Sequence, residues 1–315
     1  MPPIEGHIKA NRNGDAQAPR ALGGLADAVV LFARRASRHI IDRYGLRAWR
    51  WRRISRSGGT DPMVVRLLNE SLKIRIYPFD IIGRSIYLHG ASEPDEMAYF
   101  AQALRPGMTV MDVGANIGQY TIVAANAVGP SGSVHAFEPS ARVFGEVQFN
   151  LSLNKLRSRC VLNQVAISDR IGTAVLSEYE AGAEGYSSLG DQHWCASRQV
   201  GSTTVPTTTL DDYAAKMGVD RVDFIKMDIE GAELHALRGA ARLLSSRPPP
   251  VLLIEFADVN TAGLGYKAIE IWDFLEALGY QFRKIGFSGR CAQVMQRPPD
   301  FSQGVNLVAL VPEKP

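Results

Sequence analysis

Short apolar runs alternate with longer amphipathic stretches along the sequence from residue 108 onward. The runs are rich in β-branched and apolar residues, as buried parallel strands are, and the stretches between them are long enough for helices. This alternation predicts an α/β, Rossmann-like fold with a seven-stranded, mostly parallel sheet, helices on both faces and a final hairpin-like pair. The predicted strands are 108–113, 134–138, 161–167, 222–228, 251–256, 280–285 and 305–311. The predicted helices are 119–128, 140–154, 209–217, 231–244 and 267–278.

The residues before this alternation have a different pattern. Apolar and polar residues alternate at 72–77 and again at 81–88, which predicts a β-hairpin ahead of the main sheet. A helix is expected to begin at Glu93-Pro94 and to end at Leu104, because proline is favoured in a first helical turn. The sequence therefore predicts three parts: a basic, partly disordered or helical segment at 1–60, a hairpin and helix at 61–107 packed on the following domain, and that domain at 108–315.

The stretch from Met108 to Tyr120 contains the clearest ligand-binding pattern. An apolar strand carries Asp112 near its end and runs into a turn with glycines at 114 and 118, after which a helix is expected to begin. In doubly wound sheets, ligands bind at such strand ends, close to a helix N-terminus. A dinucleotide fingerprint would have a further glycine where this sequence has Ala115, so no pyrophosphate needs to be accommodated.

The same pattern fits S-adenosylmethionine as the cofactor. Asp112 would accept from the ammonium group of its amino-acid end, and Glu138, twenty residues beyond Gly118, would bind the ribose hydroxyls. Asp169, after the third strand, would bind the adenine, and backbone groups near Ala166 would help. Two of these residues have equally simple alternatives, since Glu138 could be a solvated carboxylate at a strand end and Asp169 a turn residue.

Three carboxylates follow the fourth predicted strand within six positions, at Asp228, Glu230 and Glu233. Like charges placed this close need a cation, a proton or a hydrogen-bond donor. Two chemistries fit. Asp228 could act as a general base toward a hydroxyl, or the cluster could hold a divalent metal. The first is favoured here without a metal ion, with Lys226 neutralising one carboxylate.

Two further regions are predicted near the ligand. Glu93 lies beside the expected pocket, although an acidic residue in a first helical turn also favours the helix dipole. Residues 178–204 interrupt the strand and helix alternation with glycines and aromatic residues, as functional loops often do. The candidate acceptor-binding residues in this loop are Tyr186, Ser187 and Ser188.

Charge and composition narrow the class of protein. The 315 residues have a formal charge of +3, but the first 60 contain twelve Lys and Arg against four Asp and Glu, so the remainder is acidic. Residues 21–56 are a candidate for peripheral membrane or nucleic-acid contact, with a solvated helix as the simpler alternative. Three scattered cysteines and the lack of a long apolar segment or secretory signal favour a cytoplasmic protein.

The ordered set of motifs resembles the FkbM family of S-adenosylmethionine-dependent methyltransferases. The matching stretches include 112–118, 136–139, 166–169, 225–233 and 253–256, and together they cover roughly residues 90–285. The resemblance implies a class I methyltransferase sheet and, usually, O-methylation of a sugar, polyketide or other natural product. The expected cofactor-binding residues are Glu93, Asp112, Gly114, Asn116, Gly118, Glu138, Ala166, Asp169 and Asp228. The expected catalytic residues are Asp228, Glu230 and Glu255, the last at the end of the fifth strand.

Other classes of protein fit the sequence less well. The missing middle glycine argues against a nicotinamide-dependent oxidoreductase. A nucleic-acid methyltransferase could use the basic N-terminal segment, but the catalytic part is acidic and lacks an Asn-Pro-Pro-aromatic motif. A non-catalytic binding module would not need carboxylates at three strand ends. We therefore predict methyl transfer to a hydroxyl of a small molecule or glycan; the sequence does not indicate an oligomeric state.

Overall fold

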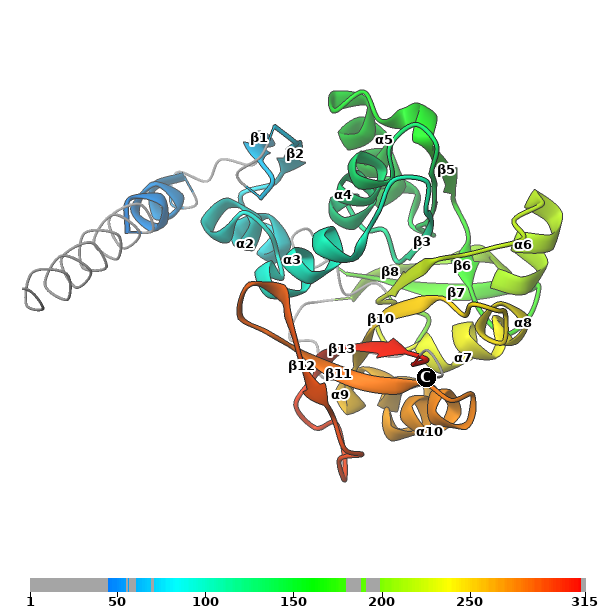
Figure 1. The fold of residues 1–315 in the computed structure, drawn as a ribbon. Helices are drawn as coiled ribbons and strands as arrows, with labels where there is room; N and C mark the ends of the chain where they lie inside the picture. The colour runs from blue at the N-terminus through cyan, green and yellow to red at the C-terminus, as the bar shows by residue number, and fades with distance from the viewer. Residues whose placement is uncertain are drawn as a thin grey trace, which may run out of the picture. The chain divides into compact units, whose positions relative to one another are not determined.

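The computed structural model describes residues 45–54, 56, 61–68, 71–179, 188–190 and 199–312. The chain divides into two compact units, Met1–Arg47 and Ala48–Pro315. Of the predicted helix within 21–56, residues 45–54 are described and are helical. None of the described helices combines the length and the apolar composition that crossing a membrane requires. The second unit contains every named strand and helix (Figure 1).

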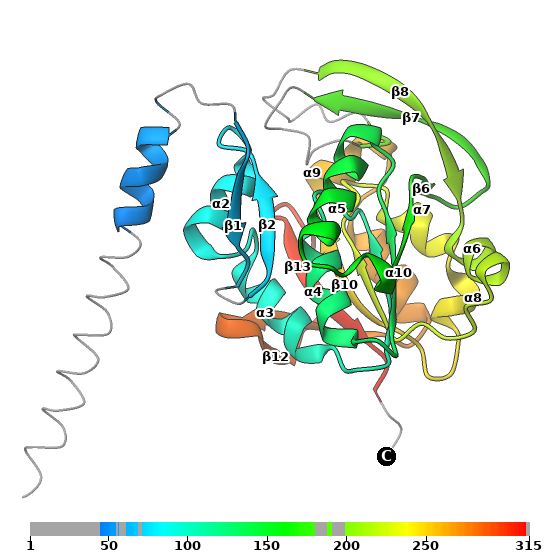
Figure 2. The same cartoon turned by 90° about the horizontal axis from the view of Figure 1, so that it is seen from above.

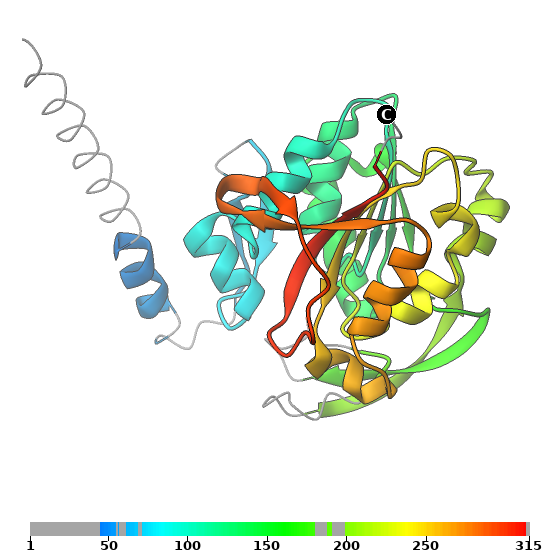
Figure 3. The same cartoon turned by 60° about the horizontal axis from the view of Figure 1, so that its bottom comes forward.

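The centre of this unit is a mostly parallel sheet, as predicted. Among the described residues it has eight strands in the order β12-β11-β13-β10-β9-β3-β4-β5. Strands β10, β9, β3, β4 and β5 are parallel, and β13 is antiparallel to its neighbours β10 and β11 (Figure 3). The bounds are β3 Thr109–Val113, β4 Ser133–Phe137, β5 Cys160–Asn163, β9 Phe224–Met227, β10 Val251–Phe256, β11 Gln281–Gly286, β12 Arg290–Val294 and β13 Val305–Leu310.

The predicted number of seven strands is wrong by one. Residues 286–303 carry no clear alternation, yet β12 within them pairs with β11 as an antiparallel edge strand. Its pairing comes from the short turn η4 (Phe287–Gly289), which returns the chain along β11. Backbone pairing across a tight turn does not require an alternating pattern, so no pattern in the sequence indicated this strand.

Helices cover both faces of the sheet, as predicted (Figure 1). Neighbouring residues of β3 show this, because Val110 belongs to one buried cluster and Met111 to the other. One face is covered by α3 (Pro94–Ala103), α4 (Gln119–Val128) and α5 (Ala141–Leu153), and the other by α6 (Leu210–Met217), α7 (Glu233–Arg238), α8 (Ala241–Leu244) and α10 (Ile269–Ala277). A short helix, α9 (Asp258–Thr261), follows β10.

The single helix predicted at 231–244 is wrong, since the chain breaks between α7 and α8 at Gly239-Ala240. The carboxylate of Asp211 accepts from the backbone N–H groups of Arg242 and Leu243, at 2.8 and 3.0 Å. This side chain from another helix satisfies the amides at the start of α8, so a second helix can begin there.

The N-terminal hairpin has one of its two predicted strands, since β2 (Lys73–Ile76) lies within 72–77, but its other strand precedes β2 in the sequence. Strands β1 (Met63–Arg66) and β2 pair with each other, whereas 81–88 form a helix, α2 (Ile81–His89). Asp80 caps this helix by accepting from the backbone N–H groups of Ile82 and Gly83, and Gly90 ends it with a φ of 89°. Capping residues at both ends outweighed the alternation that favoured a strand.

The hairpin is fixed to α5 by polar contacts. The Arg75 guanidinium donates to both oxygens of Glu146, at 2.8 and 2.9 Å. Asn150 accepts from the backbone N–H of Arg75 and donates to the carbonyl of Ile117, which lies in the ligand-binding turn. The segment before the sheet is thus tied to the turn that positions the site.

A second, three-stranded sheet takes in the two described ends of the loop predicted at 178–204. Its order is β6-β8-β7, with β6 at Ala166–Ile167, β7 at Gly172–Tyr179 and β8 at Gln199–Thr208 (Figure 2). The predicted strand 161–167 is therefore two strands, β5 and β6, in different sheets. Tyr186 and Ser187 lie outside the described residues, as do the rest of 180–187 and 191–198.

Candidate active site

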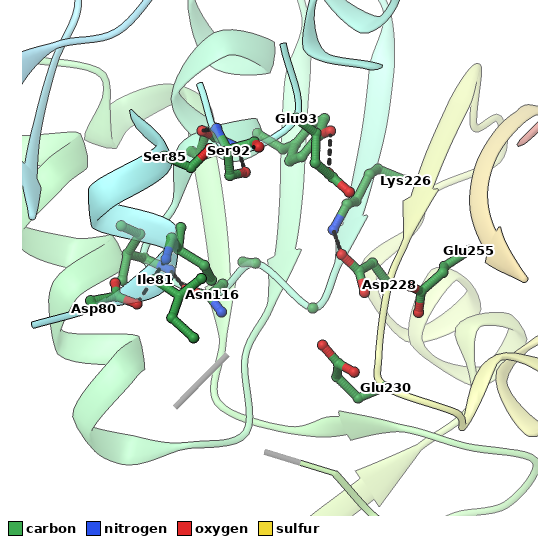
Figure 4. Close-up of a pocket in the computed structure, with 16 residues that line it drawn as sticks. Asp80, Ile81, Ser85, Ser92, Glu93, Asn116, Lys226, Asp228, Glu230 and Glu255 are labelled. Atoms are coloured by element: carbon green, nitrogen blue, oxygen red, sulfur yellow. Dashed lines mark hydrogen bonds and ion pairs between the residues drawn. The ribbon is translucent and has the colours of Figure 1, made fainter. Parts of the chain in front are cut away.

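Two cavities lie at the carboxyl ends of β3, β9 and β10, where a doubly wound sheet binds its ligands. The larger has a volume of about 310 Å³, and the smaller about 50 Å³. In the larger one, α2 and the Ser92–Glu93 segment face a wall of carboxylates (Figure 4). The smaller one is lined by Glu138, Pro139 and Ala166. Both are lined by Gly114, Asn116, Asp228 and Glu230, so one continuous set of residues connects them.

The turn between β3 and α4 has the sharp conformation that its glycines predicted. Gly114 and Gly118 have φ values of 85° and 90°, which side-chain-bearing residues rarely adopt. A Cβ atom at Gly114 would overlap the backbone carbonyl of Asp228. The missing side chain therefore lets the turn lie directly against the end of β9, which carries the candidate base.

Glu138 is buried beside this turn and fixes it. Its two oxygens accept from the backbone N–H groups of Asn116 and Ser140, both at 3.0 Å. Burial raises the pKa of Glu138 to about 7, although the two N–H donors act in the opposite direction. This burial excludes the alternative interpretation of the sequence, in which Glu138 was a solvated carboxylate at a strand end.

Asp112 is completely buried under the turn. One oxygen accepts from the Thr121 hydroxyl at 2.5 Å, and the other has no hydrogen-bond partner in the described structure. Burial raises the pKa of Asp112 to about 6. Among the described residues that line the two cavities Asp112 is absent, so a ligand's ammonium group would reach it only after the turn adjusts.

Lys226 and Asp228 form a charge pair at the junction of the cavities. The Lys226 ammonium lies 3.1 Å from the Asp228 carboxylate and 4.8 Å from the centre of the Tyr120 ring. Desolvation lowers the pKa of Lys226, but Asp228, Asp112 and Glu93 together outweigh it and raise that pKa, so the ammonium stays charged. The predicted neutralisation of one carboxylate by Lys226 is confirmed.

Glu93 joins this pair from a distant part of the chain. The Tyr120 hydroxyl donates to one oxygen of Glu93 at 2.8 Å, and the Asn306 side-chain amide donates to the other at 2.6 Å. Burial raises the pKa of Glu93, and the nearby Asp228 raises it further. Glu93 thus lines the larger cavity, as the sequence suggested, while both of its oxygens are held by the protein.

Glu230 and Glu255 lie near Asp228, on the side of the larger cavity opposite α2 (Figure 4). The amide of Asn260 donates to both, at 3.0 and 2.9 Å. Burial raises the pKa of each glutamate well above its usual range, and Asp228 adds to the shift. Asn260 was not found from the sequence, because its only signal was a position five residues after Glu255.

Glu233 and Ser188 have structural contacts. One oxygen of Glu233 accepts from the backbone N–H groups of Ile229 and Gly231, at 2.9 and 3.3 Å, so the third carboxylate obtains donors instead of a cation. The Ser188 hydroxyl donates to the Glu230 carbonyl at 2.6 Å. Ser188 is buried and supports the Glu230 backbone, whose φ is 53°.

Of the two residues predicted to bind the adenine, Ala166 and Asp169, one lines one of the two described cavities and the other lines neither. Ala166 lines the smaller cavity. Asp169 contacts His235 and Arg170, each at 3.3 Å, and is absent from the described lining of both cavities. Sequence reasoning also missed the wall formed by α2, including Ile81 and Ser85, because it assigned that segment to a strand.

Buried carboxyls predict a pH dependence of folding. Burial raises the pKa of Glu233 from 4.5 to about 7, so the folded protein holds this proton more tightly than the unfolded chain. That stabilisation is complete below pH 4.5 and is lost as the pH rises through 7. In Glu233→Gln, the fall in unfolding free energy between pH 5 and pH 8 should be smaller by about 1–3 kcal/mol than in wild type. Urea denaturation at the two pH values measures this fall in unfolding free energy. The control Glu270→Gln, at an exposed position, should show the same fall as wild type. A fall in Glu233→Gln as large as in wild type would contradict the expectation.

Within the described ranges, no group of three or more His, Cys, Asp and Glu side chains is arranged to hold a metal ion. The site combines a glycine turn at a strand end, buried carboxyl groups and one ammonium group. This combination, at the carboxyl edge of a mostly parallel sheet, is that of a Rossmann-like protein that binds a small organic ligand.

Comparison with known proteins identifies the family. The model of the methyltransferase FkbM domain matches residues 112–282, which is more than half of the chain. The chain belongs to this family. The predicted family and fold class are confirmed, and the matched domain is a methyltransferase domain.

Individual relatives are more distant. The chain is 28% identical over 160 residues to the 31-O-demethyl-FK506 methyltransferase FkbM of Streptomyces tacrolimicus, covering 43% of this chain and 60% of that protein. It is 26% identical to the 2-O-methyltransferase NoeI of Sinorhizobium fredii, covering 45% of this chain and 60% of that protein. A third relative, the hexuronic acid methyltransferase AglP of Haloferax volcanii, is 22% identical, with 59% and 71% covered. The chain thus spans about 60% of the length of the first two relatives.

Proposed function

We propose that the protein transfers a methyl group from S-adenosylmethionine to a hydroxyl of a sugar, a glycan or another small natural product. The observation that carries this proposal is the position of Asp228, which lines both cavities and so faces two ligands at once. The printed names of two relatives, an O-methyltransferase and a hexuronic acid methyltransferase, support the hydroxyl and sugar parts of the proposal.

The described residues fit the methyl donor. Its ammonium and sulfonium groups are cationic, and the larger cavity is lined by Glu93 and Asp228, while Asp112 lies buried under the turn beside it. The Asp112 oxygen without a partner is a buried acceptor that a ligand ammonium would satisfy. Glu138 and Ala166, at the smaller cavity, would hold the ribose and adenine. When bound, the donor supplies a methyl group on a good leaving group.

The chain's own part in the reaction is orientation and proton removal. Methyl transfer needs in-line positioning and a nucleophile that loses its proton. The Asp228 carboxylate, with 28% of its side chain exposed, accepts the proton of the acceptor hydroxyl at its cavity-facing oxygen. Glu230 and Glu255, held together by Asn260, accept hydrogen bonds from further hydroxyls of the acceptor.

The acceptor is a small molecule or glycan rather than a nucleic acid. The larger cavity is lined by five acidic side chains and one ammonium group among its described residues, so it lacks the excess of positive charge that binds a phosphate backbone. Peripheral membrane contact through residues 21–56 and a cytoplasmic location remain predictions from the sequence.

Donor binding is the first test. In isothermal titration, S-adenosylmethionine should bind and NADH should not. The variant Glu138→Ala should weaken donor binding by about 10–100-fold, since it removes an acceptor for the ribose and two hydrogen bonds to the backbone. The exposed variant Glu270→Ala serves as control. Binding of NADH alone would overturn the proposal.

Acceptors can then be found with a donor that carries a deuterated methyl group. Mass spectrometry would detect the label on hydroxyls of panels of glycosides and macrolides. Label found only on nitrogen, or only on nucleic acid, would show that the acceptor class is wrong.

A further inference from the structure

Lys226 occupies a constrained position in the site. Its side chain is only 6% exposed, yet its ammonium group reaches the larger cavity. Figure 4 shows it between Glu93 and Asp228, on the side of the cavity opposite α2. A buried ammonium is costly unless it is compensated, so its contacts indicate which interaction the fold maintains.

Two contacts hold this ammonium group. It lies 3.1 Å from the Asp228 carboxylate, and the face of the Tyr120 ring lies 4.8 Å away. A cation over an aromatic face is attracted by the ring's quadrupole, most strongly when water is excluded. Tyr120 is itself buried at the start of α4, so the ring forms a fixed wall behind the ammonium group.

Distant parts of the chain fix the Tyr120 ring in turn. Its hydroxyl donates to Glu93, at the N-terminal end of α3, and Glu93 accepts from Asn306 in β13. Phe100 also packs against the Tyr120 ring in an edge-to-face contact, with 5.1 Å between the ring centroids. Four elements of the fold thus converge on the placement of one ammonium group.

We infer that Lys226 is a positioning residue that acts through Asp228, and that Tyr120, anchored by Glu93 and Asn306, holds Lys226 in place. The ammonium group fixes the Asp228 carboxylate where the methyl group is transferred. The ammonium group also balances the negative charge of Asp228. A positively charged group of a ligand beside Asp228 therefore meets an ion pair and is attracted less than it would be by the carboxylate alone. This inference rests on the proposed function.

The test uses two donor-site ligands and needs no acceptor. S-adenosylhomocysteine is neutral at the position of the sulfur, whereas sinefungin carries an ammonium group where the donor carries its sulfonium and methyl. The ratio of their affinities therefore reports the charge at the reacting position. Isothermal titration at pH 8 would measure both ligands on wild type and on each variant.

Lys226→Met should raise the preference for sinefungin about tenfold, because the repulsion of one nearby charge is removed while Asp228 stays. Lys226→Arg should keep the wild-type ratio. Tyr120→Leu should shift the ratio in the same direction as Lys226→Met, and Tyr120→Phe, which keeps the ring, should shift it less. Asp228→Asn should lower the ratio. Lys216→Met, on the exposed side of α6, is the matched control for loss of a lysine charge.

A purely structural role for Lys226 would weaken both ligands by the same factor and leave the ratio unchanged, which would overturn the inference. A fall in the ratio in Lys226→Met would overturn it as well, because Asp228 would then not face the ammonium group. If wild type bound neither ligand, the proposed function would fail together with the inference. Binding of both ligands with an unchanged ratio would reject the role of Lys226 alone.

Discussion

Asp228→Asn should lower the rate of methyl transfer by ~10²–10⁴-fold while the donor still binds, because the asparagine cannot accept the proton of the acceptor hydroxyl. The carboxylate is the only change, since asparagine has nearly the same shape. Donor affinity should fall modestly, because Asp228 also contributes one negative charge near the sulfonium group. The measurement is kcat with the acceptor found by isotope transfer, together with the Kd of the donor.

A matched control exists in the same domain. Asp220→Asn makes the identical chemical change at an exposed position that lines neither described cavity, and should leave kcat unchanged. Full turnover by Asp228→Asn with normal donor binding would show that another group takes the proton. Glu230 and Glu255 would then be the next bases to substitute.

Gly114→Ala should abolish donor binding and cost about 2–4 kcal/mol of unfolding free energy. The added Cβ would overlap the carbonyl of Asp228, and alanine would be strained at a φ of 85°. To relieve the overlap, the turn must move away from the end of β9. This movement would separate Gly114 from Asp228, which line the two cavities together. Thermal denaturation and isothermal titration measure the two effects.

Gly145→Ala is the control for this substitution. Gly145 lies in α5, and a Cβ there would meet no atom within 4 Å. Alanine is favoured over glycine inside a helix, so this variant should be unchanged or up to about 1 kcal/mol more stable. Normal donor binding by Gly114→Ala would mean that the close contact between the turn and β9 is not needed for the site.

Local patterns explain which parts of the fold the sequence predicted. The strand at β3, the turn with Gly114 and Gly118, and the following helix α4 are specified by neighbouring residues. The assignment failed at α2, where a strand-like alternation competed with the Asp80 cap. It also missed β7 and β8, at 172–179 and 199–208, because these strands pair with each other through contacts between residues far apart in the sequence.

In the site, too, some features follow from neighbouring residues and others from contacts between distant parts of the chain. Glycines and carboxylates at strand ends could be recognised because the carboxyl ends of parallel strands always meet at one edge of the sheet. The structure then separates residues with similar sequence signals. Glu233 receives backbone donors, whereas Glu230 and Glu255 share the amide of Asn260.

The sequence by itself determined the alternating strands and helices of the parallel part of the main sheet, the sharp turn at Gly114 and the carboxylates at the ends of β9 and β10, because each depends on residues close together in the chain. Only the tertiary structure decided that Glu93, Tyr120 and Asn306 meet beside the Lys226 and Asp228 pair. Glu93 and Asn306 are 213 positions apart. Their contact follows from β13 lying beside β10 in the sheet, an arrangement set by strand pairing and packing across the whole domain.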